Sequence, residues 1–220
     1  MKRLKANLIS VNIGQPQPLV GLGKTVITSI NKTSVDGEIF LSKLNLEGDE
    51  QADKKNHGGL DKAVCAYPYE HYPFWEQELG NKLPLGAFGE NLTLKGLEEN
   101  NVHIGDVFQW GQAVIQVSQP RIPCHKLAKR LGNEDTPQCV IDKSYTGFYF
   151  RVLKEGTVSV TTPLHFLKRC TDYSVSFVNN NFHHDRYNEK VIEELLAVEE
   201  LAASWRSMLR GHLEKILEKQ

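Results

Sequence analysis

Hydrophobic positions in the first 170 residues form short runs, and Gly, Pro and Asn separate these runs at frequent intervals. Runs of four or five β-branched and aromatic residues between such breaks are typical of strands. The predicted strands include Val26–Ile30, Glu38–Leu41, Ala63–Tyr67 and Ala113–Val117. Because many short strands joined by tight turns favour a barrel or a sandwich, we predict a mainly β fold with a few short helices.

Two pairs of strands are expected to form hairpins. Val107–Trp110 is followed by Gly111-Gln112 and a further strand, and a two-residue turn led by Gly suits a tight hairpin. Phe148–Leu153 and Thr157–Val160, on either side of Glu155-Gly156, are predicted to pair in the same way.

Helical spacing becomes frequent only near the end of the chain. The predicted helices are Tyr69–Leu79, Lys126–Leu131, Ser174–Phe182, Asn188–Leu201 and Ala202–Lys219. We therefore expect a β-barrel domain, residues 1–170, followed by a small three-helix appendage, residues 171–220.

Composition and charge narrow the class of protein. Of the 220 residues, 40% are hydrophobic, which is enough to fill a core and excludes a disordered chain. The 26 basic and 27 acidic residues give a net charge of −1, which argues against a nucleic-acid polymer as partner. There is no apolar run of about 18 residues and no apolar stretch behind the charged N-terminus. We therefore expect no membrane span, no signal peptide and a cytoplasmic location.

The four cysteines, Cys65, Cys124, Cys139 and Cys170, are too few and too widely spaced for a disulfide framework or a CxxC metal site. Cys65 lies within a predicted strand and is expected in the core. Cys124 differs from the others because its segment, Gln119–Lys126, joins a predicted strand to a predicted helix.

Three features of this segment favour the thiolate form of Cys124. Backbone N–H groups are unpaired at the start of a helix, and Arg121, His125 and Lys126 add positive charge. Two prolines also stiffen the segment. The thiolate binds metals and acts as a nucleophile, so Cys124 is a candidate for either role. The alternative is an inert, buried cysteine.

Two other segments contain candidate binding residues. In Asp53–Lys62, Lys55 and His57 precede two glycines, and the backbone of such a loop can approach an anion closely. Glu90 and Asn91 offer a carboxylate and an amide that can hold the hydrogen-bonding edge of a heterocycle. For both segments the alternative is a solvated or strand-connecting turn.

Six segments, in this order along the chain, resemble those of a known family. They are LEGDEQAD (46–53), KNHGG (55–59), YPYEHY (67–72), FGENL (88–92), IGD (104–106) and QVSQPRIPC (116–124). They are similar to the MOSC-domain family, and within it to the stand-alone bacterial proteins of the YiiM type, in which three helices follow the barrel. The resemblance spans nearly the whole chain.

The resemblance implies a MOSC-type β-barrel that binds molybdenum cofactor, with Cys124 as the ligand to molybdenum. It also implies reduction of N-hydroxylated compounds, such as hydroxylaminopurines and amidoximes. The electrons would come from a separate donor, for which a flavoprotein is expected.

The resemblance also suggests roles for individual residues. Cofactor contacts are expected from Lys55, His57, Gly58, Asn91, Arg121, Cys124 and Arg151. The proton for N–O cleavage is expected from His57 or Glu90, and the sequence leaves that choice open.

Two other functions are compatible with the sequence. A cofactor or sulfur carrier would use Cys124 to hold a persulfide, and an interaction module would dock a partner through the helical tail. We favour the enzyme.

Overall fold

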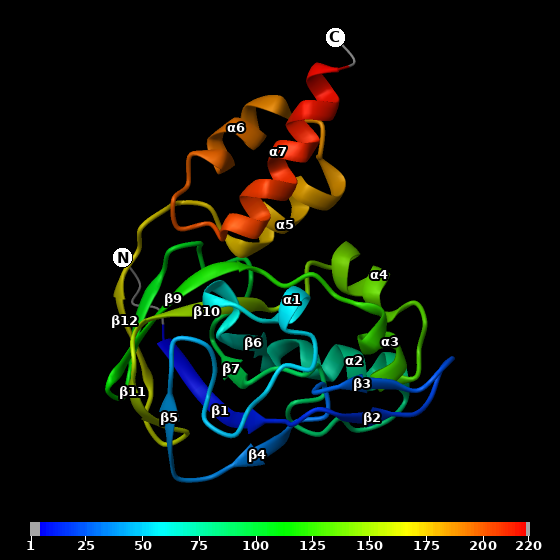
Figure 1. Cartoon of the computed structure of the whole chain (residues 1–220), viewed down its shortest axis with the longest axis vertical. Coiled ribbons are helices and arrows are strands. Elements are labelled where there is room, and N and C mark those ends of the chain that lie inside the picture. The colour runs from blue at the N-terminus through cyan, green and yellow to red at the C-terminus, as the bar shows by residue number, and fades with distance from the viewer. Residues whose placement is uncertain (1–4, 219–220) are drawn as a thin grey trace.

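The computed structural model describes residues 5–218, and in this part of the chain seven strands close into a barrel (Figure 1). The barrel strands are β1 (Lys5–Ile13), β6 (Val64–Pro68), β7 (Leu92–Lys95), β8 (Val107–Trp110), β9 (Ala113–Pro120), β10 (Phe148–Lys154) and β12 (Leu164–Lys168). Their order is β12-β8-β9-β10-β6-β7-β1, and β1 pairs again with β12 to complete the ring. Only the pair β6–β7 is parallel among the described strands. The predicted mainly β barrel is confirmed.

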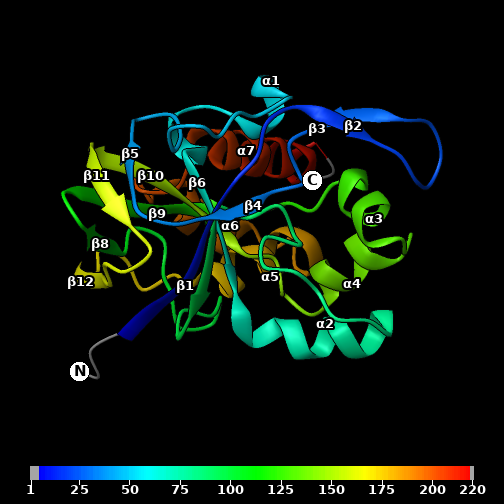
Figure 2. The ribbon, with the colours of Figure 1, turned by 90° about the horizontal axis from the view of Figure 1, so that it is seen from below.

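Five shorter strands lie outside the ring. They are β2 (Gln17–Leu19), β3 (Val26–Thr28), β4 (Thr33–Val35), β5 (Glu38–Leu41) and β11 (Gly156–Ser159). Strand β4 extends the sheet beside β1, while β2 and β3 form a hairpin that projects from the barrel next to α3 (Figure 2). Lys129 of α3 (His125–Leu131) holds the tip of this hairpin, because its Nζ donates to the carbonyl oxygens of Gly21 at 3.1 Å and Lys24 at 2.8 Å.

One hairpin prediction is confirmed and the other is wrong. Strands β8 and β9 pair across Gly111-Gln112 as expected. Strands β10 and β11 do not pair, and β11 instead pairs with β5. The reason is that β9 and β6 occupy the two edges of β10, which leaves no free edge for its neighbour in sequence.

Four short helices accompany the barrel in the described chain: α1 (Lys54–His57), α2 (Tyr72–Leu79), α3 and α4 (Thr136–Asp142). The predictions of α2 and α3 are confirmed, and α4 was missed because its few apolar positions show no clear period. The aromatic side chains of Tyr67, Trp75 and Phe88 are fully buried where α2 packs against the barrel.

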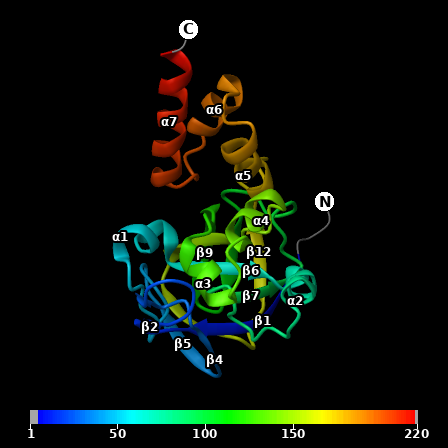
Figure 3. The same cartoon turned by 90° about the vertical axis from the view of Figure 1, so that its right-hand side faces the viewer.

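The C-terminal region contains three helices, α5 (Val175–His184), α6 (Glu189–Leu196) and α7 (Ala203–Leu217), which confirms the predicted appendage. They form one group at one end of the barrel (Figures 1 and 3). Ser174 and Asn188 cap α5 and α6, since their side chains accept hydrogen bonds from backbone N–H groups in the first turn. Within residues 5–218, no helix is long and apolar enough to cross a membrane.

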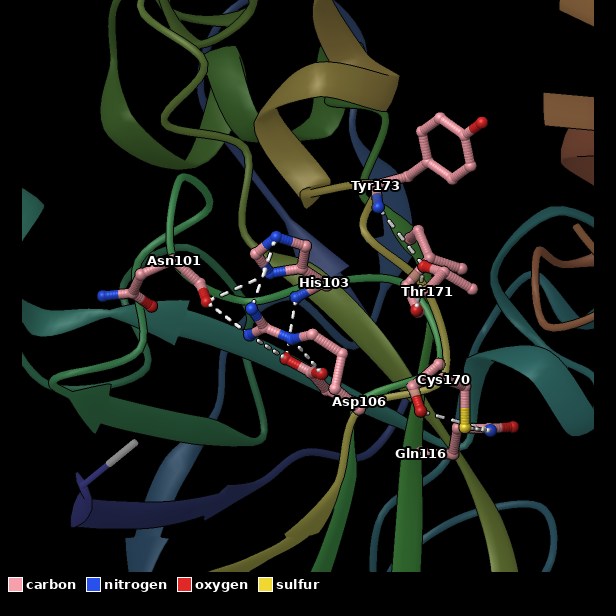
Figure 4. Close-up of polar contacts among 10 residues, drawn as sticks. Asn101, His103, Asp106, Gln116, Cys170, Thr171 and Tyr173 are labelled. Carbon is pink, nitrogen blue, oxygen red and sulfur yellow. Dashed lines mark hydrogen bonds and ion pairs between the residues drawn. The ribbon is translucent and has the colours of Figure 1, made fainter. Parts of the chain in front are cut away.

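An ion pair anchors the segment that leads from the barrel to these helices (Figure 4). The Asp106 side chain is fully buried and accepts hydrogen bonds from Arg169 Nε and Nη2, both at 2.9 Å, and from His103 N at 2.9 Å. Arg169 also donates to Asn101 O at 3.0 Å. Because Arg169 directly follows β12, this network fixes the direction in which the chain leaves the barrel.

The start of α7 is attached to the barrel at a second place. Ala202 N donates to Ser118 O at 2.9 Å, Ala203 N to Asp61 Oδ2 at 3.3 Å, and Ser204 Oγ to Gln119 Oε1 at 3.3 Å. Ser118 and Gln119 belong to β9, so the first turn of α7 lies beside the end of the strand that leads to Cys124.

Candidate functional site

A cavity of about 650 Å³ including open space lies beside β6, β10 and the loops around them. Its walls include Lys32, Asp49, Asp53, His57, Lys62, Cys65, Asn91, Arg121, Cys124, Lys126 and Tyr149. The residues come from the loops before β4 and β7, from the segment between β5 and β6 that contains α1, from β6 and β10, and from the segment after β9. Folding therefore brings two thiols and several cationic groups into one enclosure.

Cys124 lies at the position predicted from the sequence, between β9 and α3. It is the N-cap residue of α3 with extended backbone, and its side chain makes no capping hydrogen bond. The residue is partly exposed, whereas Pro123 before it is buried. The thiol is thus held on a stiff segment at the cavity wall and is not used to complete the helix.

Arg121 is buried in the same wall, with only 7% of its surface exposed. No carboxylate among the described residues lies within ion-pair distance of its guanidinium. Burial disfavours the charged form of Arg121, whereas Cys65, Tyr149, Cys124 and the carboxyl of Glu90, when ionised, raise the pKa of Arg121. A buried charge normally has an opposite charge beside it, so this guanidinium is suited to an anionic ligand.

The position of Arg121 depends on a close backbone approach. Its N–H donates to Gly147 O at 3.1 Å. Gly147 has a φ of +68°, and a Cβ atom there would lie 2.4 Å from Ala66 O. Only glycine therefore fits at this crossing of β10 and β6.

A buried network forms the opposite wall. Asp49 accepts hydrogen bonds from Gly14 N at 2.8 Å and Asn91 Nδ2 at 3.0 Å, and it forms an ion pair with Lys32. Asn91 also accepts from Cys65 N at 3.0 Å. Lys32 thus has a carboxylate in contact, whereas Arg121 has none within ion-pair distance among the described residues.

His57 lies at the end of α1 with its ring on the cavity wall. Its Nδ1 is 3.8 Å from Asp53 Oδ2. Burial and the nearby charge of Lys126 lower the pKa of His57, although Asp53 opposes this effect. The imidazole is therefore largely uncharged at neutral pH.

Glu90 is separated from the cavity. It is fully buried behind the wall and does not line the enclosure. Its carboxylate accepts hydrogen bonds from Tyr72 Oη at 2.5 Å, Thr93 Oγ1 at 2.8 Å and Phe88 N at 3.1 Å. These contacts fasten the loop before β7, so the structure gives Glu90 a supporting position away from Cys124.

Three other predicted residues also lie outside this cavity. Arg151 donates from Nε to Asp61 Oδ1 at 2.8 Å and from Nη1 to Gln116 Oε1 at 3.0 Å. Lys55 lines a neighbouring cavity, and Gly58 lines neither. A Cβ atom at Gly58 would lie 2.7 Å from Lys54 O, so this glycine permits the chain to leave α1.

Several residues of the wall were not predicted from the sequence, among them Lys32, Asp49, Cys65 and Tyr149. Cys65 is buried, as expected, but it also lines the cavity, and its register partner in β10 is Tyr149. Burial raises the pKa of both side chains. Their position follows from the pairing of β6 with β10, which local sequence patterns do not reveal.

A second cavity, of about 1080 Å³ including open space, adjoins the first. Cys124 and His57 line both. The far wall of the second cavity is formed by Ser204, Trp205 and Met208 of α7, which faces α1 across the gap (Figure 3). Within the described chain, no group of three or more His, Cys, Asp or Glu residues could hold a metal ion.

Known proteins share this two-part organisation. The model of the MOSC domain matches residues 53–165, and the model of the YiiM-like 3-alpha helix domain matches residues 174–215. The chain is 48% identical to the protein YflK of Bacillus subtilis over 99% of both chains. It superimposes on the crystal structure of YiiM from Geobacillus stearothermophilus with a TM-score of 0.80 and 36% identity, covering 94% of this chain and 99% of the other.

A more distant relative is named a reductase. This protein of Gibberella moniliformis is 36% identical over 67% of the chain, and the match covers 27% of the relative. The family models agree with the barrel and the three C-terminal helices, and the similarity to YflK and to the YiiM structure extends over nearly the whole chain. The chain therefore belongs to the MOSC-domain family and carries a YiiM-like three-helix domain behind its barrel.

Proposed function

We propose that this protein binds molybdenum cofactor in the first cavity through Cys124 and reduces N-hydroxylated compounds. The observation that carries the proposal is the buried guanidinium of Arg121, unpaired among the described residues, beside a thiol that makes no capping bond. MOSC domains are associated with this cofactor in general, and a reductase name occurs among the relatives.

The residues of the cavity fit the cofactor chemically. Its phosphate is an anion that Arg121 can neutralise, and the thiolate of Cys124 is a soft ligand suited to a metal that already carries sulfur ligands. Asn91 and Asp49 fix the opposite wall from two neighbouring loops. Preformed walls lower the entropic cost of holding a rigid, multi-ring ligand.

When bound, the cofactor supplies the two electrons of the reaction. An N-hydroxylamine, RNHOH, takes up two electrons and two protons, its N–O bond breaks, and RNH₂ and water are released. The electrons require a separate donor protein, for which we propose a flavoprotein. The role of the chain is to orient the substrate, exclude bulk water and deliver protons.

His57 is the residue that we assign to proton delivery. It lines both cavities, and Asp53 lies close enough to influence its orientation. A lowered pKa makes the imidazolium a stronger acid once it forms, and the neutral ring can donate a hydrogen bond to an oxygen. Glu90 is less suited because its oxygens already accept several hydrogen bonds within the fold.

Replacing Cys124 by Ser tests the proposal. Protein purified without air from cells that make the cofactor should contain molybdenum and reduce a hydroxylaminopurine with reduced viologen as donor. Cys124→Ser should lower turnover by at least about 100-fold, because a hard hydroxyl replaces a soft ligand. The control is Cys139→Ser, since Cys139 lines neither cavity, and it should keep both metal and turnover. Wild-type protein that carries sulfane sulfur on Cys124 but no molybdenum would instead support a sulfur carrier.

Replacing Arg121 by Met should have opposite effects on stability and on cofactor retention. Removing a buried charge that has no carboxylate partner should raise the free energy of unfolding of the cofactor-free protein by about 1–2 kcal/mol. The same change should lower the fraction of protein that retains cofactor.

Arg151→Met is the matched control, and it should destabilise the protein because it leaves Asp61 without its ion-pair partner. Urea unfolding and pterin analysis measure the two effects. If Arg121→Met destabilised the cofactor-free protein as much as Arg151→Met, the guanidinium would be serving the fold and not a ligand.

The pKa of His57 can be measured by NMR titration of its ring. We expect a value below 6.5, and Lys126→Gln should raise it because the main repelling charge is removed. Lys54→Gln changes a charge that lines neither cavity and should leave the pKa of His57 unchanged. Because the unfolded state binds this proton more readily, His57 should lower stability as the pH falls below about 6.5. A pKa at or above 6.5, or one insensitive to Lys126, would contradict the assignment.

A further inference from the structure

The second cavity combines an apolar wall with a cationic rim. Its apolar lining includes Met208 of α7 and Ile122, and both of these residues retain exposed surface. Trp205, one turn before Met208, has no exposed surface and packs against Phe182 with ring centroids 4.9 Å apart, so it holds α7 in place behind the lining. Such a wall suits a flat, largely apolar ring.

The rim of this cavity has a surplus of positive charge. Lys55 and Lys126 both line it, and within residues 5–218 neither forms an ion pair with a carboxylate. The neighbouring Lys54 points to a different partner, because its Nζ is 2.9 Å from Glu50 Oε1. Lys62, also in the wall, donates to the backbone oxygen of Asn56 at 2.7 Å.

Asp53 supplies the one carboxylate that lines the second cavity among the described residues. Both of its oxygens already accept hydrogen bonds. It accepts hydrogen bonds from Asn56 N at 3.1 Å and Asn56 Nδ2 at 2.9 Å. The charges of Lys55, Lys62 and Lys126 therefore exceed the negative charge of the wall. A ligand that fills this space should carry an anionic group next to its ring.

The two cavities share part of their lining, including Cys124, His57 and Lys126, whereas Lys55 lines the second cavity alone. A cofactor in the first cavity and a substrate in the second would then reach the thiol from different sides. The reacting nitrogen of the substrate would lie near Cys124, with the rest of the molecule between α1 and α7. This arrangement assigns the second cavity to the non-reacting part of the substrate.

We propose that the second cavity binds the substrate as a nucleotide, with its base against the α7 wall and its phosphate at Lys55 and Lys126. This inference rests on the proposed function and narrows its substrate class to N-hydroxylated nucleoside phosphates. The reaction consumes two electrons from the reduced cofactor, resupplied by the separate donor, and two protons. It breaks the N–O bond, releases water and leaves the phosphate unchanged.

Binding of the reaction product tests the proposal without any turnover. Adenosine 5′-monophosphate is the product expected from its N6-hydroxylated form, and calorimetry with the full chain measures its affinity. It should bind at least about 10-fold more tightly than adenosine, since two lysines contact the phosphate. Lys55→Gln and Lys126→Gln should each weaken binding by about 5-fold, and the neighbouring control Lys54→Gln by less than about 2-fold. Equal affinity for adenosine and its monophosphate, or equal effects of Lys54→Gln and Lys55→Gln, would overturn the proposal.

Three further measurements separate this proposal from its alternatives. If inorganic phosphate competes as tightly as adenosine 5′-monophosphate, the cavity binds simple anions and the proposal fails. If a nucleotide is released in equal amount with the cofactor from denatured protein, the cavity holds an extension of the cofactor and the proposal also fails. With hydroxylated base, nucleoside and monophosphate as substrates, the monophosphate should have the highest kcat/KM. If the protein turns over all three substrates without this preference, the nucleotide proposal fails and the proposed reductase activity stands. If the nucleotide binds in a lysine-dependent way but no substrate is turned over, the proposed reductase activity fails and the nucleotide site stands.

Discussion

The buried positive charge of Arg121 determines which kind of ligand the first cavity can bind. The guanidinium of Arg121 is 7% exposed, and no carboxylate of residues 5–218 lies at ion-pair distance. Transferring a cation out of water costs several kcal/mol unless an anion compensates. A second cation of the cavity with a buried side chain, Lys32, has such a partner in Asp49. Arg121 is therefore the position at which the site needs a ligand.

The barrel holds this charge next to a thiol through rigid elements. Strand β9 pairs with β8 and β10 and ends at Pro120, so Arg121 and Cys124 follow directly from a strand fixed on both edges. The same strand end receives α7, through Ser118 and Gln119. The C-terminal helices are thus attached where they can form a wall of the second cavity. Barrel segments and α7 therefore line two adjoining cavities.

Local patterns in the sequence were sufficient for elements whose partners are adjacent in the chain. The β8–β9 hairpin, α3 and the three C-terminal helices follow from turn residues, periodic apolar positions and caps. Strand β11 was placed wrongly because its pairing with β5 spans more than a hundred residues, and local sequence does not encode which edge is free. Local sequence predicts where strands occur in this chain, but it does not predict the order of the strands in the sheet.

The candidate site was predictable to a similar degree. Cys124, Arg121, His57 and Asn91 meet at one cavity, as the family motifs implied. Glu90 lies in a neighbouring motif position but is turned into the fold, where four hydrogen-bonding groups surround it. Conversely, Cys65 enters the wall through the register of β6 with β10, a long-range feature. Motif order identifies which segments meet, whereas side-chain direction depends on the packed structure.

The proposed function depends on the thiolate of Cys124 binding the metal of a cofactor held by Arg121. X-ray absorption at the molybdenum edge of protein loaded with cofactor counts the sulfur ligands directly. Cys124→Ser loaded with the same cofactor provides the comparison, and Cys65→Ser controls for the other thiol of the cavity. We predict one more sulfur ligand in the wild type than in Cys124→Ser, and no change in Cys65→Ser. The same sulfur count in wild type and Cys124→Ser would contradict the account.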